Sequence, residues 1–145
     1  MPDKPNSLRE YVGGIVDDAL ARCTACGRCY EVCPMPGYSE RLADAQPREV
    51  LGQVLGVLRR EQGHSLGLEF IRVCTQSACC IPACPEGINP MLMLRVGRMV
   101  ALGSLGDPKQ MEGREEPQFF SKIDTYAALQ LDDRELVDWH DRRLP

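Results

Sequence analysis

The sequence has few aromatic residues, no long basic run and no long apolar run. Aromatic side chains make up 6% of the 145 residues, and the longest basic runs are the pairs at 59–60 and 142–143. Nucleic-acid binding needs clustered positive charge, so a nucleic-acid partner is not expected. The most apolar stretch, 91–102, is interrupted by Arg95 and Arg98. Since a membrane-spanning helix needs roughly 18 or more apolar residues, we expect no direct membrane span.

Strand-like alternation of apolar and polar residues is also lacking. Apolar residues instead recur every three or four positions, which is typical of helices that bury one face. We therefore expect an all-α fold. Charged residues make up 26% and apolar residues 43% of the chain, an ordinary composition for a domain with one modest core.

Residues 1–20 do not have the pattern of a cleavable secretory leader, because charged side chains interrupt them throughout. These charges are Asp3, Lys4, Arg9, Glu10, Asp17 and Asp18. We expect a cytoplasmic protein, with a position at the periphery of a membrane complex as the alternative. A reducing cytosol would keep the thiols of the chain free for metal.

Local signals predict where several helices begin and end. Ser7 and Glu10 form a capping box that opens a helix. Pro47 suits a first helical turn, and the apolar residues after it are spaced as on a helix that Gly63 ends. Asn89, followed by proline, is the expected N-terminal cap of the most apolar helix.

Gly103 is the expected C-terminal cap of that helix, and Asp132 with Glu135 forms a second capping box further along the chain. The stretch between them is rich in glycine and proline before helical spacing resumes at Phe119. We expect four parts: a disordered N-terminus (1–6), a helical domain (7–103), a linker (104–118) and a C-terminal helical docking segment (119–145).

Eight cysteines stand in two groups. The first group is Cys23, Cys26, Cys29 and Cys33, and the second is Cys74, Cys79, Cys80 and Cys84. The first spacing, C-x2-C-x2-C-x3-C-P, is the bacterial ferredoxin run for four-iron clusters. Three thiolates in one tight loop suit one face of a cube, whereas the fourth, followed by proline, points away and can bind a different cluster.

Disulfides and zinc are the alternatives for these cysteines. A disulfide framework needs an oxidising compartment, which the absence of a leader does not favour. Tetrahedral zinc sites usually take two well-separated cysteine pairs, whereas here three cysteines follow one another at three-residue steps. Iron–sulfur clusters are therefore the preferred interpretation.

The second group departs from the regular run. Counting back from Cys84, cysteines are expected at 80, 77 and 74, but position 77 is Ser77. Three thiolates and an open corner would give a three-iron cluster. Cys79 is the alternative fourth ligand, although adjacent residues rarely aim both side chains at one cube without a turn between them. Serine oxygen is a poorer ligand for iron, and Cys79 as a buried free thiol is the remaining reading.

The cysteine clusters would add negative charge to a chain whose formal net charge is −4. Arg22, Arg28 and Arg72 flank the cysteine runs and are placed to offset that charge and raise the reduction potentials. The equally simple interpretation is that each of these three arginines is a solvated surface residue.

Two motifs resemble the α-helical ferredoxin domain. They are the segment 22–34, RCTACGRCYEVCP, and the segment 84–90, CPEGINP. This domain occurs in the iron–sulfur subunits of succinate dehydrogenase and fumarate reductase, in the C subunit of heterodisulfide reductase, and in anaerobic glycerol-3-phosphate and glycolate dehydrogenases. The resemblance covers about residues 8–103, and in length and content the chain looks closest to the heterodisulfide reductase C subunit.

The resemblance implies two clusters between helical layers, with crossed ligation. The first, a [4Fe-4S] cluster, would take Cys23, Cys26, Cys29 and Cys84. The second, a [4Fe-4S] or [3Fe-4S] cluster, would take Cys33, Cys74 and Cys80, with Cys79 as the candidate fourth ligand.

The implied function is an electron-transfer subunit of a multi-subunit oxidoreductase. It would relay electrons between a flavoprotein and a cysteine-rich disulfide-reductase-like partner or a quinone. No acid, base or nucleophile constellation accompanies the cysteines, so substrate chemistry is expected in a partner. The alternatives are a catalytic subunit that binds substrate at an open corner of the second cluster, and an iron–sulfur sensor.

Overall fold

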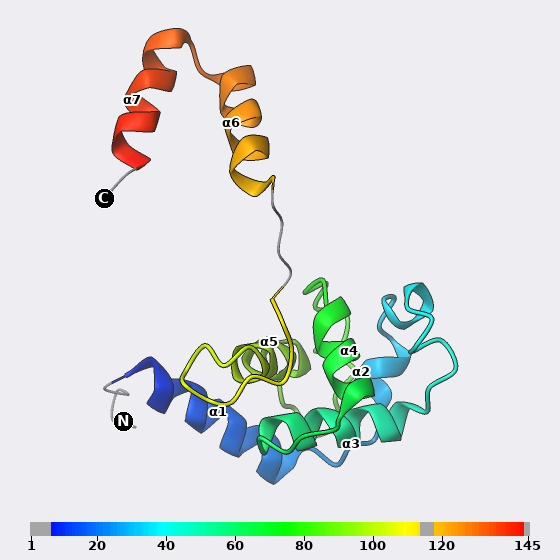
Figure 1. Cartoon of the computed structure of the whole chain (residues 1–145). Helices are drawn as coiled ribbons and strands as arrows, with labels where there is room; N and C mark the ends of the chain where they lie inside the picture. The colour runs from blue at the N-terminus through cyan, green and yellow to red at the C-terminus, as the bar shows by residue number, and fades with distance from the viewer. Residues whose placement is uncertain (1–6, 114–117, 144–145) are drawn as a thin grey trace. The chain divides into compact units, whose positions relative to one another are not determined.

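A computed structural model describes residues 7–113 and 118–143, and every regular element in these ranges is helical (Figure 1). The all-α prediction is confirmed, since the described residues contain no strand. The predicted disordered N-terminus, 1–6, lies outside the described residues. Within them, no helix combines the length and the hydropathy needed to cross a bilayer. The elements are α1 (Leu8–Arg22), α2 (Arg28–Glu31), the 3₁₀ turn η1 (Pro36–Tyr38), α3 (Pro47–Leu58), α4 (Ser65–Val73), α5 (Pro90–Ala101), α6 (Phe119–Gln130) and α7 (Asp133–Arg143).

The chain divides into two compact units, Met1–Glu112 and Gly113–Pro145. In the first unit, α3 and α5 are central: they contact each other and both contact α1 and α4, while the short α2 lies on α3 (Figure 1). The side chains between these helices are almost entirely apolar, and their burial is the main source of stability. The most deeply buried include Val16, Val50, Leu51, Val54, Leu58, Phe70, Ile71, Met93 and Val100.

Three predicted helix caps of this unit, at Ser7, Asn89 and Gly103, are confirmed. The Ser7 hydroxyl accepts the backbone N–H of Glu10 at 3.1 Å, and the Asn89 side-chain oxygen accepts that of Leu92 at 2.9 Å. Gly103 follows α5 with a φ of 70°, the left-handed conformation that ends many helices. These signals involve residues three or four apart, so the sequence alone carries them.

The prediction that Gly63 ends α3 is wrong. The helix stops at Leu58, because Arg60 adopts the left-handed conformation with a φ of 66°. The N–H of Glu61 then bonds back to the Gly56 carbonyl at 3.0 Å, which is the closing bond of a Schellman motif. Glycine usually occupies this left-handed position. Here Arg60 occupies it, and its ion pair with Asp107 stabilises the conformation.

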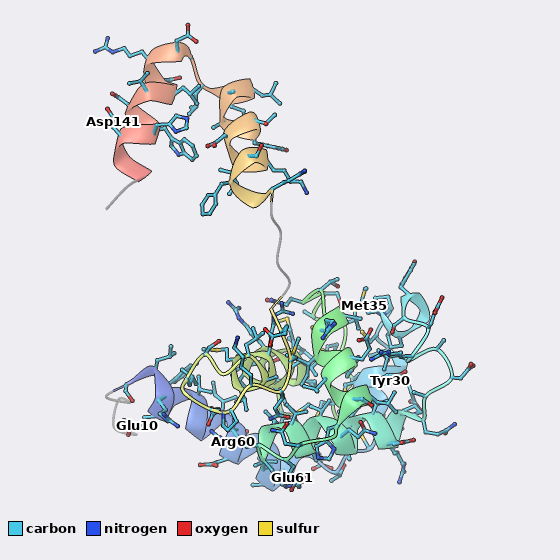
Figure 2. The ribbon with its side chains drawn as sticks, in the orientation of Figure 1. Glu10, Tyr30, Met35, Arg60, Glu61 and Asp141 are labelled. Atoms are coloured by element: carbon cyan, nitrogen blue, oxygen red, sulfur yellow. The ribbon has the colours of Figure 1, made fainter. Side chains whose placement is uncertain are left out.

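Residues 103–112 pack on the first unit, although most of them fall in the predicted linker. The Met111 side chain is buried. The Asp107 carboxylate is only 5% exposed, and it accepts Nε of Arg60, at the end of α3 (Figure 2), at 2.7 Å. Arg9, from α1, lies 3.7 Å from the same carboxylate. This segment therefore ties the start of α1 to the end of α3.

Asp107→Ala is expected to lower the free energy of unfolding by about 1.5–3 kcal/mol, the range for hydrogen bonds to charged groups. The substitution leaves the strained Arg60 without its buried partner. Anaerobic urea unfolding of the full chain measures the effect. Glu112→Ala is the matched control: its ion pair with Lys109 is largely exposed, so the change should stay within about 0.5 kcal/mol. Equal losses in both variants would contradict the buried ion pair.

The second unit is a hairpin of α6 and α7. The predicted capping box is confirmed, since the Asp132 carboxylate accepts the N–H groups of Arg134 and Glu135, and Glu135 accepts the N–H of Asp132 at 3.0 Å. Several large apolar side chains of this hairpin are exposed, namely Phe120, Tyr126, Leu129 and Val137. Its role as a docking segment stays a prediction.

Candidate metal centre

The first cysteine segment begins with a tightly turned loop directly after α1, which contains Cys23 and Cys26. Cys23 is the cap of α1, and its N–H bonds to the Ala19 carbonyl at 2.9 Å. Ala25 and Gly27 follow with φ angles of 52° and 87°. Residues that alternate between right- and left-handed conformations can point their N–H groups into a concavity, a shape found at many iron–sulfur sites. Cys29 then lies in α2, beyond this loop.

The second cysteine segment has the same unusual backbone. Cys74 follows α4, and Gln76 and Ala78 have φ angles of 59° and 65° on either side of Ser77. Among the described residues, three of the four non-glycine positions with positive φ lie between cysteines. Such conformations cost energy and concentrate at functional sites. Both segments are therefore shaped for something other than helix packing.

The first set of thiols contains one cysteine from the second segment. Cys23, Cys26 and Cys29 line a small pocket together with Cys84, and the rest of its wall is largely apolar. The apolar side chains include Leu51 from α3, Met93 from α5, Ile88 and Pro90. The helical packing thus brings Cys84 beside the first three cysteines, across a long stretch of chain.

The ionisation of these thiols reflects the same proximity. Burial raises the pKa of Cys29 to about 12, and the neighbouring thiols of Cys23, Cys80 and Cys26 raise it as well. Burial also raises the pKa of Cys23, to which Cys84 and Cys26 add. Thiolates collected in an apolar pocket repel one another, and a bound cation removes that repulsion.

The second set contains one cysteine from the first segment. Burial raises the pKa of Cys33, and the thiols of Cys74 and Cys79 raise it further. Burial also raises the pKa of Cys80, to which Cys74, Cys33 and Cys79 add. Cys33 is therefore within electrostatic reach of Cys74, Cys79 and Cys80, the grouping that crossed ligation would need. Cys80 is likewise within electrostatic reach of Cys29.

One cysteine in each set stands out in exposure, while the other six are half-buried. Cys29, in the first set, is 8% exposed, whereas Cys79, in the second, is open to solvent. The reading of Cys79 as a buried free thiol is therefore wrong. Its S–H faces the Ser77 carbonyl at an S···O distance of 3.9 Å. Ser77 itself is exposed.

All eight cysteines are free thiols. Within residues 7–113 and 118–143, no three Cys, His, Asp or Glu side chains are arranged to hold a single metal ion. The donor atoms of such a site lie about 2.0–2.3 Å from the ion and almost touch one another. The ligands of a cluster bind different corners of an iron–sulfide core and stand farther apart. Soft thiolates around an apolar pocket are the donor set that iron–sulfur clusters take.

Arg22 connects the two cysteine segments. Its guanidinium donates to the Glu86 carbonyl at 2.6 Å, in the turn that follows Cys84, and pairs with Asp18 at 3.0 Å. Because Arg22 directly precedes Cys23, this bond holds Cys84 beside the first loop. The sequence predicts that Arg22 offsets the charge of the cysteine sites, and the structure adds this positioning role.

Two further positions escaped the sequence analysis. Tyr30, between Cys29 and Cys33, is buried, donates its hydroxyl to the Leu42 carbonyl, and lies 5.0 Å from the Phe70 ring between centroids (Figure 2). It anchors α2 in the core. Gly27 is the other, because its close approach to α3 depends on tertiary structure that no local pattern reports.

No protein family, curated protein or solved structure was found to match the chain. The resemblance to the α-helical ferredoxin domain therefore rests on the cysteine motifs and remains an expectation.

Proposed function

We propose that this chain is an iron–sulfur electron-transfer subunit with an α-helical ferredoxin architecture. The observation that carries the proposal is the pocket in which Cys84, from the second segment, joins Cys23, Cys26 and Cys29. The C-x2-C-x2-C-x3-C-P run favours iron–sulfur clusters over disulfides and zinc, and crossed ligation would place Cys84 in this pocket.

The first cluster would be held by Cys23, Cys26, Cys29 and Cys84. The second would be held by Cys33, Cys74 and Cys80 with one further ligand. When bound, each cluster supplies a centre that gains and loses one electron at a time. The protein residues would hold the clusters between the helices, shield the first with apolar side chains from α3 and α5, and keep the two next to each other.

Electron relay needs a donor and an acceptor. We propose a flavoprotein on one side and a cysteine-rich disulfide-reductase-like subunit or a quinone on the other, with the protein in the cytoplasm or at the edge of a membrane complex. The exposed Cys79 thiol in the second set supports this role, since a cluster near the surface can exchange electrons with a partner that an interior cluster cannot reach.

The test is anaerobic purification of the full chain with iron and sulfide analysis. About seven or eight iron atoms and a similar amount of sulfide per chain are expected for two clusters. Chemical reduction should produce EPR signals of two interacting centres, and a flavoprotein should co-purify from the source cells. Stoichiometric zinc without sulfide, or four disulfides in the native protein, would overturn the proposal.

A further inference from the structure

The cysteine spacing does not identify the fourth ligand of the second cluster. Cys33, Cys74 and Cys80 account for three thiolates. Ser77 occupies the regular position of the fourth, and Cys79 lies two residues beyond it. The three possibilities are Cys79, Ser77 and an open corner, and they predict different clusters.

The backbone supplies the turn that ligation by adjacent cysteines needs. The N–H of Ile81 bonds to the Ala78 carbonyl at 3.1 Å, so Cys79 and Cys80 are the two central residues of a turn. Ala78, immediately before them, is left-handed. In a helix or a strand two successive side chains diverge, whereas the chain reverses direction at this point. The steric objection to ligation by both residues is therefore removed.

The surroundings of Cys79 also favour its thiol over the Ser77 hydroxyl. The turn closed by Ile81 and Ala78 carries the Cys79 thiol directly beside Cys80, and the side chain is exposed instead of packed into the helical core. Its thiol is thus available to the cluster that Cys80 would hold. Sulfur is also the softer ligand and the better match for iron–sulfide.

We propose that Cys79 is the fourth ligand of the second cluster. The inference rests on the proposed function, because it needs a cluster at this set of thiols. The second cluster is then a complete four-iron centre, and Cys79 places one of its corners at the protein surface. The iron atom at this corner then has no free coordination position for a substrate. This argues against a catalytic subunit that binds substrate at the second cluster, whereas electron exchange at the surface is still possible.

Cys79→Ala in the full chain, purified anaerobically, tests the ligand directly. Wild-type protein is expected to contain about eight iron atoms, and the variant about one fewer. The oxidised variant should show the EPR signal of a three-iron cluster, with the first cluster unchanged. Ser77→Ala is the matched control from the same loop and should keep all the iron and the wild-type spectrum.

A rescue variant separates ligation from a structural effect. Adding Ser77→Cys to Cys79→Ala restores a thiol at the regular spacing, and the lost iron and the four-iron spectrum should return. Intact wild-type protein gives a check without any substitution: iodoacetamide should modify Cys79 only after the clusters are removed, although the residue is exposed.

Three results overturn the inference and leave the proposed function standing. The first is a three-iron cluster already present in wild-type protein. The second is loss of iron in Ser77→Ala with none in Cys79→Ala. The third is modification of Cys79 by iodoacetamide while both clusters are intact. Wild-type protein without iron and sulfide would instead reject the proposed function itself.

Discussion

Cys84→Ser is expected to remove the cluster held by Cys23, Cys26 and Cys29, although Cys84 belongs to the other cysteine segment. The shared pocket would keep only three of its thiols, and serine oxygen is a poor substitute for thiolate. Because changes even outside the ligand shell reduce metal affinity about 10–100-fold, the affinity for the first cluster should fall at least about tenfold. EPR and iron analysis of the anaerobic protein measure the loss.

The reciprocal variant is Cys33→Ser, which should damage the second cluster and spare the first. In the sequence, Cys33 follows the three cysteines assigned to the first cluster. Its thiol nevertheless interacts electrostatically with Cys74 and Cys80 of the second segment. If each variant instead damaged the cluster of its own segment, the crossed arrangement would be wrong and each segment would bind its cluster alone.

Gly27→Ala is expected to destabilise the first unit by about 2–4 kcal/mol, from left-handed strain and overpacking together. Gly27 has a φ of 87°, and a Cβ placed there would lie 2.6 Å from Cβ of Pro47 and 3.1 Å from its carbonyl carbon. The first turn of α3 cannot yield without moving the helix. Since Gly27 lies between Cys26 and Cys29, iron content should fall together with the urea midpoint.

Gly37→Ala is the control for this substitution. Gly37 is exposed and not left-handed, and a Cβ there would meet nothing within 4 Å. Its unfolding free energy should stay within about 0.5 kcal/mol of wild type. Wild-type stability and full iron content in Gly27→Ala would show that the loop is not held against α3 as described.

Several features of the fold could be predicted because they depend on neighbouring residues. The caps at Ser7, Asn89 and Asp132 join a side chain to a backbone group two or three residues away, and Gly103 ends its own helix. The absence of strand-like alternation was enough to predict the all-α class. Such signals are present in any short window of the sequence.

Other features depended on residues far apart. α3 ends early because Arg60 is held by Asp107, 47 residues later, and no pattern near Gly63 reports that ion pair. Met111 lies in a glycine- and proline-rich stretch that indicates a linker, yet it is buried in the first unit. The composition of a segment indicates its local conformational preferences, whereas its burial depends on the surface against which it packs.

The spacing of the cysteines by itself determined the chemistry we propose, because ligands within one loop are positioned by covalent geometry over a few residues. Only the tertiary structure decided how the two loops combine. The packing of α3 and α4, between the cysteine segments, places Cys84 in the first set, Cys33 in the second and Cys79 at the surface. These positions result from helices that associate to bury their apolar faces, and the contacts between those faces are not encoded in either cysteine motif.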